Sequence, residues 1–360
     1  MSRLIRAVID SRALHSNLIR IRAAAPGRKV MAVVKANAYG HGLVPTALAL
    51  SGADAFAVAR IEEAVWLRAA GVRQPIVLLE GVFDGDQLGE AARLDLDLVV
   101  HAPEQLALLE QEVPSHRFVT WLKVDTGMNR LGFRPEEFAG ALSRLQALTN
   151  GCVREIRLMT HFARADERGD PMTAAQLRRF EALTEGLGYA RSMANSAAIL
   201  GSPASHGEWI RPGLALYGVS PFPGEAATSF DLRPAMTLET VVIATRRVPS
   251  GETVGYGGTW RAERDSRVAI IAAGYGDGLP WSLPAGTAVM VDGLRCPLVG
   301  RVSMDMIAVD VSATGERIGA GARAVLWGAE LPVEEMAGSA RTIPYELLCS
   351  VSQRVPLVLG

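Results

Sequence analysis

The sequence predicts a (β/α)8 TIM-like barrel followed by a mostly-β C-terminal domain. In the first part of the chain, eight apolar runs that end in a polar residue alternate with segments of helical pattern, and such strands pair in parallel. After residue 225 the alternation stops, and short β-rich runs separated by Gly and Asp turns follow. The 360 residues suit one large or two ordinary domains. We therefore predict a barrel over residues 1–225 and a β domain over residues 226–360, against which residues 1–10 pack.

Each apolar run of the first part is bounded by turn signals, which indicates a strand buried on both faces of a parallel sheet. The runs cover residues 30–35, 56–60, 76–80, 96–101, 118–125, 156–161, 192–195 and 209–211. Helical patterns lie between them, several with Pro or Thr near the first turn, at residues 61–70, 103–112, 135–148 and 173–187. An open doubly wound sheet is the alternative, but eight strand–helix units favour the closed barrel.

The region after residue 225 has the pattern of a separate β domain. Its β-rich runs cover residues 241–248, 268–273, 288–291, 306–311 and 324–327. Asp292-Gly293 has the composition of a two-residue hairpin turn. Tyr256 and Tyr275 are flanked by glycines, which either form simple turns or free each tyrosine to reach a ligand.

Composition and charge exclude several classes of protein. With 49% hydrophobic and 21% charged residues the chain is globular and not disordered. Its net charge of −1 gives no basic surface for nucleic acid or anionic lipid. The three cysteines have no CxxC spacing, and neither a signal peptide nor a run of ~18 apolar residues is present, so we expect a soluble cytoplasmic protein. The six histidines are scattered, which predicts no metal site.

The polar residues that end the eight runs are candidate site residues, because the carboxyl ends of barrel strands face the active site. They are Lys35, Arg60, Glu80, His101, Asp125, His161, Asn195 and Arg211. Each alone could be an ordinary solvated strand end, and His161 could equally be a satisfied core histidine. Together they converge on one face of the predicted barrel.

Lys35 is the most informative of these residues. It either points to water or is desolvated so that its amine is neutral and nucleophilic, as a Schiff-base lysine requires. The small residues 36–38, the hydroxyl of Tyr39 and the glycines that follow favour the second interpretation. The loops around Ser196 and Gly213 follow the seventh and eighth strands, where barrels commonly bind phosphate. A Schiff-base lysine and a phosphate cradle together suit pyridoxal 5'-phosphate (PLP).

Six motifs, in this order, resemble those of bacterial alanine racemases, the PLP-dependent, barrel-type fold III family. They lie at residues 32–42, 123–132, 160–163, 211–213, 254–258 and 301–305, so the resemblance covers essentially the whole chain. It implies that the protein converts L-alanine to D-alanine as a head-to-tail homodimer with shared active sites. The D-alanine would supply peptidoglycan or the enzyme would serve alanine catabolism, and the sequence does not choose between these roles.

The resemblance also implies residue roles. Lys35 would carry PLP and act as one base, with Tyr256 of the partner subunit as the other. The remaining PLP contacts would come from Tyr39, His161, Asn195, Ser196, Arg211, Gly213, Leu214 and Tyr345. Arg130 and the partner's Met304 would bind substrate, and Lys123 would be the position that is often carbamylated in the family. Asp166, Tyr275 and Arg301 would form the entrance gate.

Arg211 would face the pyridine nitrogen of PLP. In most PLP enzymes an acid at this place keeps the nitrogen protonated. Arginine does not do so, because its own pKa exceeds ~12 and it stays charged, with no site to accept a proton. The ring would then be a weaker electron sink, which favours reprotonation at Cα over side reactions. Three positions depart from the family pattern: Ser192, Ser303 and Trp281 stand where a histidine, a cysteine and an arginine are common.

Three other functions fit part of the pattern. A broader-specificity or serine racemase would share the fold, and only a substrate panel separates it from an alanine enzyme. A PLP decarboxylase of similar architecture would keep an acid at the pyridine nitrogen, against which Arg211 argues. A non-catalytic PLP-binding protein would resemble the barrel alone, against which the β domain with Tyr256 argues.

Overall fold

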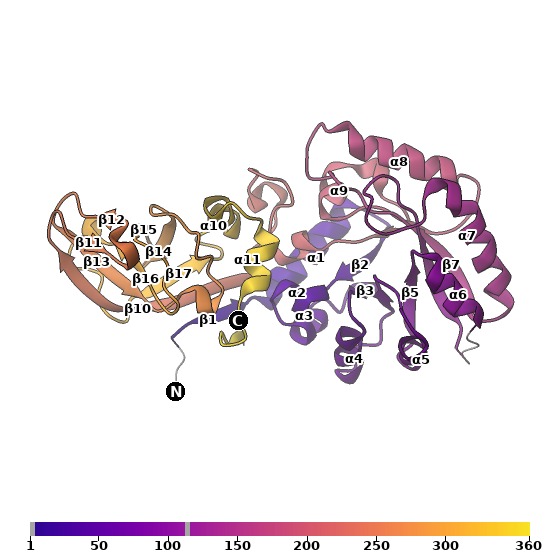
Figure 1. The fold of residues 1–360 in the computed structure, drawn as a ribbon, viewed down its shortest axis with the longest axis horizontal. Helices are drawn as coiled ribbons and strands as arrows, with labels where there is room; N and C mark the ends of the chain where they lie inside the picture. Colours follow the sequence, from indigo (N-terminus) through magenta and orange to yellow (C-terminus); the bar gives the residue numbers. More distant parts are fainter. Residues whose placement is uncertain (1–3, 112–115) are drawn as a thin grey trace.

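The computed structural model describes residues 4–111 and 116–360 and shows a barrel joined to an elongated β domain (Figure 1). Eight parallel strands close the barrel in chain order. They are β2 (Lys29–Val33), β3 (Ala55–Val58), β4 (Ile76–Leu78), β5 (Leu96–Val100), β6 (Phe118–Lys123), β7 (Val153–Met159), β8 (Arg191–Ser192) and β9 (Trp209–Ile210). Pairing of Val30 with Ile210 closes the ring. Every residue of β3 to β6 is buried, as expected for strands covered on both faces, and the predicted fold class is confirmed.

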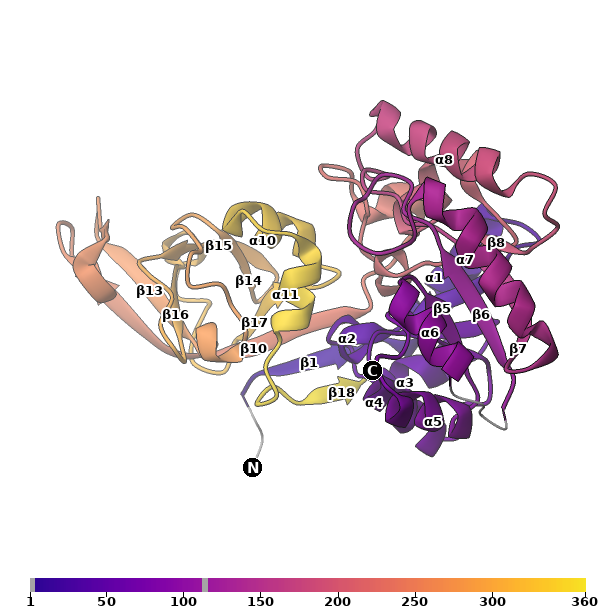
Figure 2. The same ribbon diagram turned by 45° about the vertical axis from the view of Figure 1, so that its right-hand side comes forward.

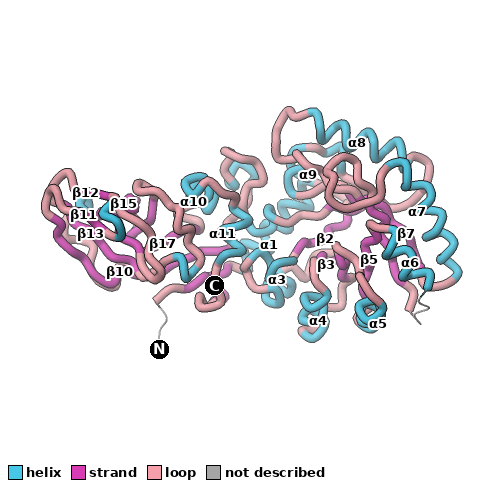
Figure 3. Tube along the Cα trace, viewed as in Figure 1, coloured by secondary structure: helices cyan, strands magenta, loops and turns pink. Residues whose placement is uncertain are grey.

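Helices cover the outside of the barrel, whereas strands and loops dominate the other domain (Figure 3). The barrel helices are α1 (Ser11–Ala24), α3 (Leu43–Ala49), α4 (Ile61–Ala69), α5 (Gly85–Arg93), α6 (Pro103–Gln111), α7 (Pro135–Ala147), α8 (Pro171–Thr184) and α9 (Ser196–Gly201). Carboxylate caps start several of them: Asp10 accepts from the N–H groups of Arg12 and Ala13 at the start of α1. The four predicted helices are present with slightly shifted ends, and residue 112 lies outside the described residues.

The β domain is built on an eight-stranded sheet in the order β13-β16-β15-β14-β17-β10-β1-β18. Its strands are β1 (Arg6–Ile9), β10 (Met236–Val248), β13 (Ser266–Ile271), β14 (Ala288–Val291), β15 (Leu294–Val299), β16 (Ile307–Asp310), β17 (Arg323–Trp327) and β18 (Leu357–Leu359). The strands β11 (Thr253–Val254) and β12 (Trp260–Arg261) form a separate hairpin. Two helices, α10 (Val333–Ala340) and α11 (Pro344–Ser350), complete the domain. Asp292 and Gly293 both have positive φ at the β14–β15 turn, which the hairpin prediction requires.

The strand β1 belongs to the sheet of the β domain and not to the barrel. It runs antiparallel to β10, with Val8 opposite Thr237, and parallel to β18, with Val8 opposite Val358. The chain therefore starts in the β domain, forms the whole barrel and returns (Figure 2). Residues 1–3 of the predicted packing segment lie outside the described residues.

Side chains from four barrel strands pack together inside the barrel. The guanidinium of Arg157 lies 5.2 Å from the ring centre of Trp121 and 5.1 Å from that of Trp209. Asp97 lies 3.6 Å from Arg157, and burial raises the pKa of this carboxyl to about 6. Because β6 and β9 are not neighbours in the ring, these side chains meet inside it. This packing leaves the carboxyl ends of the strands as the face on which a site can form.

Candidate active site at the carboxyl end of the barrel

Lys35 begins a single left-handed turn, α2 (Lys35–Tyr39). The prediction placed this residue at a strand end, but β2 stops at Val33, and Ala36, Asn37, Ala38 and Tyr39 all have φ between +50° and +54°. A left-handed conformation costs a residue with a Cβ roughly 1–2 kcal/mol, so four in a row cost on the order of 4–8 kcal/mol. Strain of this kind persists only where the surrounding structure enforces it, and it is concentrated at functional sites.

Hydrogen bonds hold both ends of the turn. The N–H of Ala36 donates to Glu63 Oε1 at 2.6 Å, and the N–H of Leu43 donates to Asn37 Oδ1 at 2.8 Å. At the other end, His41 Nδ1 lies 3.1 Å from the carbonyl oxygen of Ala38 and 2.9 Å from that of Tyr39, and donates to them. The turn that carries Lys35 is thus fixed by Glu63 and His41 from outside it and by Asn37 within it.

The burial of His41 makes stability depend on pH. Burial lowers the pKa of this imidazole to about 4, although the hydrogen bonds to the two carbonyl oxygens act in the opposite direction. Since the usual histidine pKa is near 6.5, unfolding takes up a proton when the pH lies between about 6.5 and 4, and stability is lost as pH falls through that window. We expect the free energy of unfolding to fall between pH 7 and 4 by roughly 3 kcal/mol more in wild type than in His41→Gln. Urea unfolding of both proteins across this range measures the difference, and equal pH slopes would contradict the assignment.

The amine of Lys35 lies in a cationic environment. Burial lowers its pKa, and Arg130 lowers it further, while Glu80, Glu63 and Cys349 raise it. Burial, Arg211, Arg130 and Lys35 together lower the pKa of Lys123 to about 8. These mutual effects show that the predicted residues Lys35, Lys123, Arg130 and Arg211 are gathered at one site. A concentration of positive charge like this one suits an anionic ligand and favours the neutral form of the lysine amines.

A small cradle lies beside Lys35, between the loops that follow β8 and β9. Ser196 Oγ accepts from the N–H groups of Gly213 and Ala215 at 2.9 and 3.2 Å. A Cβ placed on Gly213 would lie 2.7 Å from the hydroxyl oxygen of Tyr39, so a larger residue there would displace the Tyr39 ring. The ring of Tyr39 packs against that of Tyr345 from α11, with ring centres 5.6 Å apart. The predicted phosphate contacts therefore converge from four parts of the chain.

Two further predicted PLP contacts, Asn195 and Leu214, flank this cradle. Asn195 Oδ1 accepts from the N–H of Ala198 at 3.0 Å and caps α9. Leu214 is buried at the start of the short turn Leu214–Tyr217. Both residues shape the backbone on which Ser196 and Gly213 are carried.

Arg211 is buried, and its guanidinium donates to the carbonyl oxygen of Met193 at 3.3 Å. Arg211 also donates to Ser192 Oγ and to the carbonyl oxygen of Thr160, both at 2.6 Å, and lies 3.4 Å from His161 Nδ1. Burial lowers the pKa of Arg211 to about 10, so it keeps its charge at neutral pH. The pKa of His161 is well below its usual value because of burial and the neighbouring cations. Ser192, which departs from the family pattern, therefore supplies a direct neutral partner for Arg211.

Other strand-end residues form the walls of the site or its supports. Glu80 lies 3.9 Å from Arg60, and its carbonyl oxygen is 3.0 Å from His101 Nε2. Asp125 accepts from the N–H groups of Gly127 and Asn129 and so shapes the loop that carries Arg130. Asp166 lies in an exposed loop after β7. Burial of Tyr345 and, to a smaller extent, the charge of Asp166 raise the pKa of Tyr345 to about 12.

The structure does not bring the remaining predicted residues near Lys35 within one chain. Tyr256 sits on the β11–β12 hairpin, at the end of the β domain farthest from the barrel (Figures 1 and 2). Its side chain is 71% exposed. Nearby lie other exposed side chains; we call the set Tyr256, Tyr275, Trp281, Arg301 and Met304 the β-domain patch.

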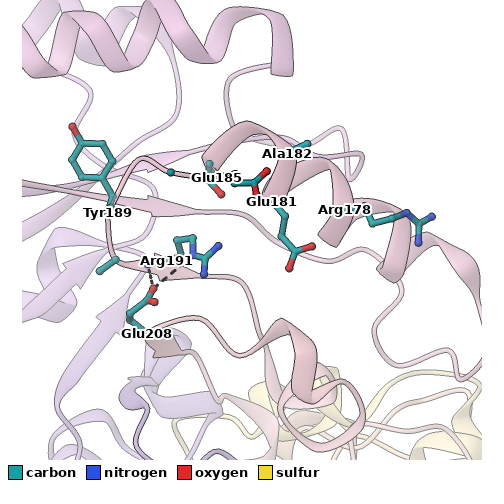
Figure 4. Close-up of a pocket in the computed structure, with 11 residues that line it drawn as sticks. Arg178, Glu181, Ala182, Glu185, Tyr189, Arg191 and Glu208 are labelled. Carbon is teal, nitrogen blue, oxygen red and sulfur yellow. Dashed lines mark hydrogen bonds and ion pairs between the residues drawn. The ribbon is translucent and has the colours of Figure 1, made fainter.

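A surface hollow of about 750 Å³ lies elsewhere, between α8 and the start of β8 (Figure 4). Its lining carries both signs of charge, with Arg191 paired to Glu208 and with Glu181 and Arg178 nearby. Because it adjoins the amino end of β8, it is separate from the site around Lys35. Among the described residues, no group of three His, Cys, Asp or Glu side chains is placed to hold a metal ion. No helix in residues 4–111 or 116–360 has the length and apolar character needed to cross a membrane.

Comparison with known proteins agrees with this geometry. Residues 9–221 match the alanine racemase N-terminal domain and residues 235–359 match the alanine racemase C-terminal domain. Alanine racemase from Aeromonas hydrophila is 51% identical over 97% of both chains, and that from Shewanella amazonensis is 49% identical over 98% of both. The crystal structure of biosynthetic alanine racemase from Pseudomonas aeruginosa has a TM-score of 0.96 and 45% identity, with 100% of both chains covered. This chain therefore belongs to the alanine racemase family and is an amino-acid isomerase.

Proposed function

We propose that the protein interconverts L- and D-alanine with PLP as its cofactor and two bases on opposite faces of the substrate. Lys35 is one base, and Tyr256 of the partner subunit is the other. The observation that carries the proposal is the turn α2: it begins at Lys35, whose pKa is lowered, and ends at Tyr39, whose hydroxyl lies against Gly213, the partner of Ser196.

The residues of the site fit PLP. Tyr39, Ser196 and Gly213 would hold its phosphate, since a side chain at Gly213 would fill the space beside the Tyr39 hydroxyl. Arg211 would face its pyridine nitrogen, with His161 beside the ring. When bound, PLP supplies an electron sink for the charge that develops at Cα as the α-proton leaves.

Lys35 and Tyr256 have complementary tasks in this mechanism. A base that works alone on one face returns the proton to that face, whereas inversion needs a second group opposite it. Burial and Arg130 favour the neutral amine of Lys35, which can then take a proton. The phenol of the partner's Tyr256 supplies or removes the proton on the other face.

Arg211 limits the reaction to proton transfer at Cα. With a pKa of about 10 it stays protonated at neutral pH and acts as a hydrogen-bond donor. It therefore gives no proton to the pyridine nitrogen, which leaves the sink weak and favours prompt return of a proton to Cα. This argues for racemisation over decarboxylation or transamination.

A second copy of the chain completes the site in this proposal. Tyr256 cannot serve Lys35 of its own chain, because its hairpin lies at the far end of the β domain (Figure 1). The β-domain patch exposes large apolar side chains, with Trp281 60% and Met304 53% accessible, and exposed apolar side chains that cluster mark interaction surfaces. A head-to-tail homodimer would place the β-domain patch of each copy, which includes Arg301, Tyr275 and Met304, against the barrel mouth of the other copy. Arg130 and Asp166 lie at that mouth.

We expect Gly213→Ala to weaken PLP retention by at least about tenfold, because the added Cβ would lie 2.7 Å from the Tyr39 hydroxyl. Spectrophotometric titration of the PLP-free protein with PLP measures the affinity. Gly140→Ala on the exposed side of α7, where a Cβ would meet nothing within 4 Å and φ is not positive, is the control for introducing an alanine in place of a glycine. Equal affinity in the Gly213 variant and wild type would contradict the cradle.

The deciding experiment couples D-alanine formation to D-amino-acid oxidase and records the visible spectrum of the same purified protein. We expect D-alanine from L-alanine and an absorbance band of bound PLP. Absence of either contradicts the proposal. A panel of Ala, Ser, Lys and Arg decides between an alanine enzyme and a broader or serine-preferring racemase. We place the enzyme in the cytoplasm on the strength of its isolated cysteines, with peptidoglycan supply or alanine catabolism as its role.

A further inference from the structure

Glu63 in α4 is a buried carboxylate with only backbone partners among its hydrogen bonds. Glu63 is 7% exposed. Oε1 accepts from the N–H of Ala36 at 2.6 Å, and Oε2 accepts from those of Ala59 and Arg60 at 2.9 and 3.1 Å. One carboxylate thus ties together the connection after β2 and the connection after β3.

The bonds to Ala59 and Arg60 have an ordinary explanation. Glu63 is the third residue of α4, and a glutamate at that position commonly reaches back to the N–H at the helix start. The bond to Ala36 has no such explanation, because Ala36 belongs to a different connection. It is also the shortest of the three bonds.

Ala36 is the residue directly after Lys35 and the first with left-handed φ. Its N–H belongs to the peptide unit that leaves Lys35, so a partner on that N–H sets the direction in which the Lys35 side chain departs. A carboxylate is a strong partner for an N–H in a buried place. Glu63 therefore controls the geometry of the turn at the point where the reactive lysine is attached.

We propose that Glu63 is a positioning residue, whose carboxylate holds the peptide after Lys35 and so fixes the place of the Lys35 amine for catalysis. This inference rests on the proposed function, in which that amine is one of the two bases. Glu63 touches neither substrate nor cofactor in this assignment and acts through Lys35.

Electrostatics supports the assignment. Burial is the main cause of the lowered pKa of Lys35; Arg130 lowers it further, whereas Glu80, Glu63 and Cys349 raise it. Loss of the Glu63 charge therefore lowers the pKa of Lys35, whereas a change that moves the charge without removing it has a smaller effect. Charge and reach can be separated by two substitutions.

The test uses Glu63→Gln, which keeps the length of the side chain but removes its charge, and Glu63→Asp, which keeps the charge but shortens the reach. Glu62→Gln is the matched control, because Glu62 is exposed on the same turn of α4. Two properties of the full-length dimer are measured: kcat and KM of the holoenzyme, and the pH profile of Lys35 modification by trinitrobenzenesulfonate in protein freed of PLP. Peptide mass spectrometry identifies the modified lysine.

We expect both Glu63 variants to lower kcat by about 10²-fold with little change in KM, since a displacement of about 1 Å at a reacting group has an effect of this size. In Glu63→Gln the midpoint of Lys35 modification is expected to move to lower pH by roughly half a unit, and in Glu63→Asp by less. Glu62→Gln should match wild type in both properties.

A wild-type kcat in Glu63→Gln overturns the proposal, and so does an equal loss in Glu62→Gln. Should Glu63→Gln fail to fold by circular dichroism, Glu63→Asp decides: wild-type kcat in that variant overturns it. If the wild-type protein yields no D-alanine, the proposed function fails. The modification profile then still tests Glu63, because an unchanged midpoint in Glu63→Gln refutes its effect on Lys35.

Discussion

Replacement of Lys35 by alanine is expected to lower kcat/KM for racemisation by about 10⁴-fold in both directions, the upper end of the range for an acid–base group. The loss is symmetric because the lysine both anchors the cofactor and exchanges a proton with the substrate. The assay is D-alanine formation from L-alanine and the reverse, each as initial rates.

The visible spectrum gives an independent result for the same variant. We expect the absorbance of PLP bound through Lys35 to disappear and free PLP to be lost on gel filtration. Lys29→Ala is a matched control, because Lys29 is an exposed lysine at the start of β2, the strand that leads to Lys35. Retained turnover in Lys35→Ala, or an equal loss in Lys29→Ala, would contradict the role of Lys35.

Replacement of Tyr256 by phenylalanine is expected to lower kcat by about 10³-fold while PLP stays bound. The side chain is exposed on the hairpin, so the loss of its hydroxyl leaves the fold intact. In deuterated water, exchange of the α-proton should slow for the enantiomer whose proton faces Tyr256 and persist for the other. Equal slowing for both enantiomers would count against two separate bases, and Tyr189→Phe, remote from Lys35 in the hollow beside α8, serves as the control.

Mixing the two inactive variants tests whether subunits share sites. A hybrid of Lys35→Ala and Tyr256→Phe chains has one site with neither group and one site with both. After unfolding and refolding of an equal mixture, about half of the dimers are hybrids, so about a quarter of wild-type activity should return. No recovery in refolded mixtures, with wild type refolding normally, would argue that each chain uses its own Tyr256.

The barrel was predictable because burial on both faces leaves a clear record in sequence. Runs such as 56–60 and 76–80 are apolar up to their polar last residue, and the structure has β3 and β4 there. The shortest strands, β8 and β9, have two residues each. Their positions were predicted from the alternation of strands and helices more than from their own composition. The small strands β11, β12 and β18 had no such record, since each has only two or three residues.

The turn at Lys35 was not predictable from local preference. Alanine has a Cβ that disfavours positive φ, yet Ala36 and Ala38 both adopt it. The groups that enforce the turn include Glu63, which lies 27 residues along the chain. Tertiary contacts decide the conformation here, and only the glycines at 40 and 42 gave a local sign of an unusual backbone.

Some site residues were likewise predictable from the sequence, and others were not. The strand-end rule found Lys35 and Arg211, which the structure gathers with Lys123 and Arg130. The rule also selected Arg60, whose charge pairs with Glu80 at the rim. It said nothing of Glu63 or Ser192, because a buried carboxylate inside a helix and a serine within a strand have no distinctive pattern. The role of Tyr256 came from resemblance, since its place depends on a second chain.

The position of β1 has a consequence for how the protein is made. During translation this strand leaves the ribosome early, but its neighbours β10 and β18 are synthesised only after the whole barrel. The barrel can close while β1 waits unpaired, whereas the sheet that positions the β-domain patch cannot be completed until β18 emerges. Contacts so distant in sequence form slowly. Assembly of the shared sites should therefore be a late, post-translational event, which a stalled nascent chain ending before β18 would not reach.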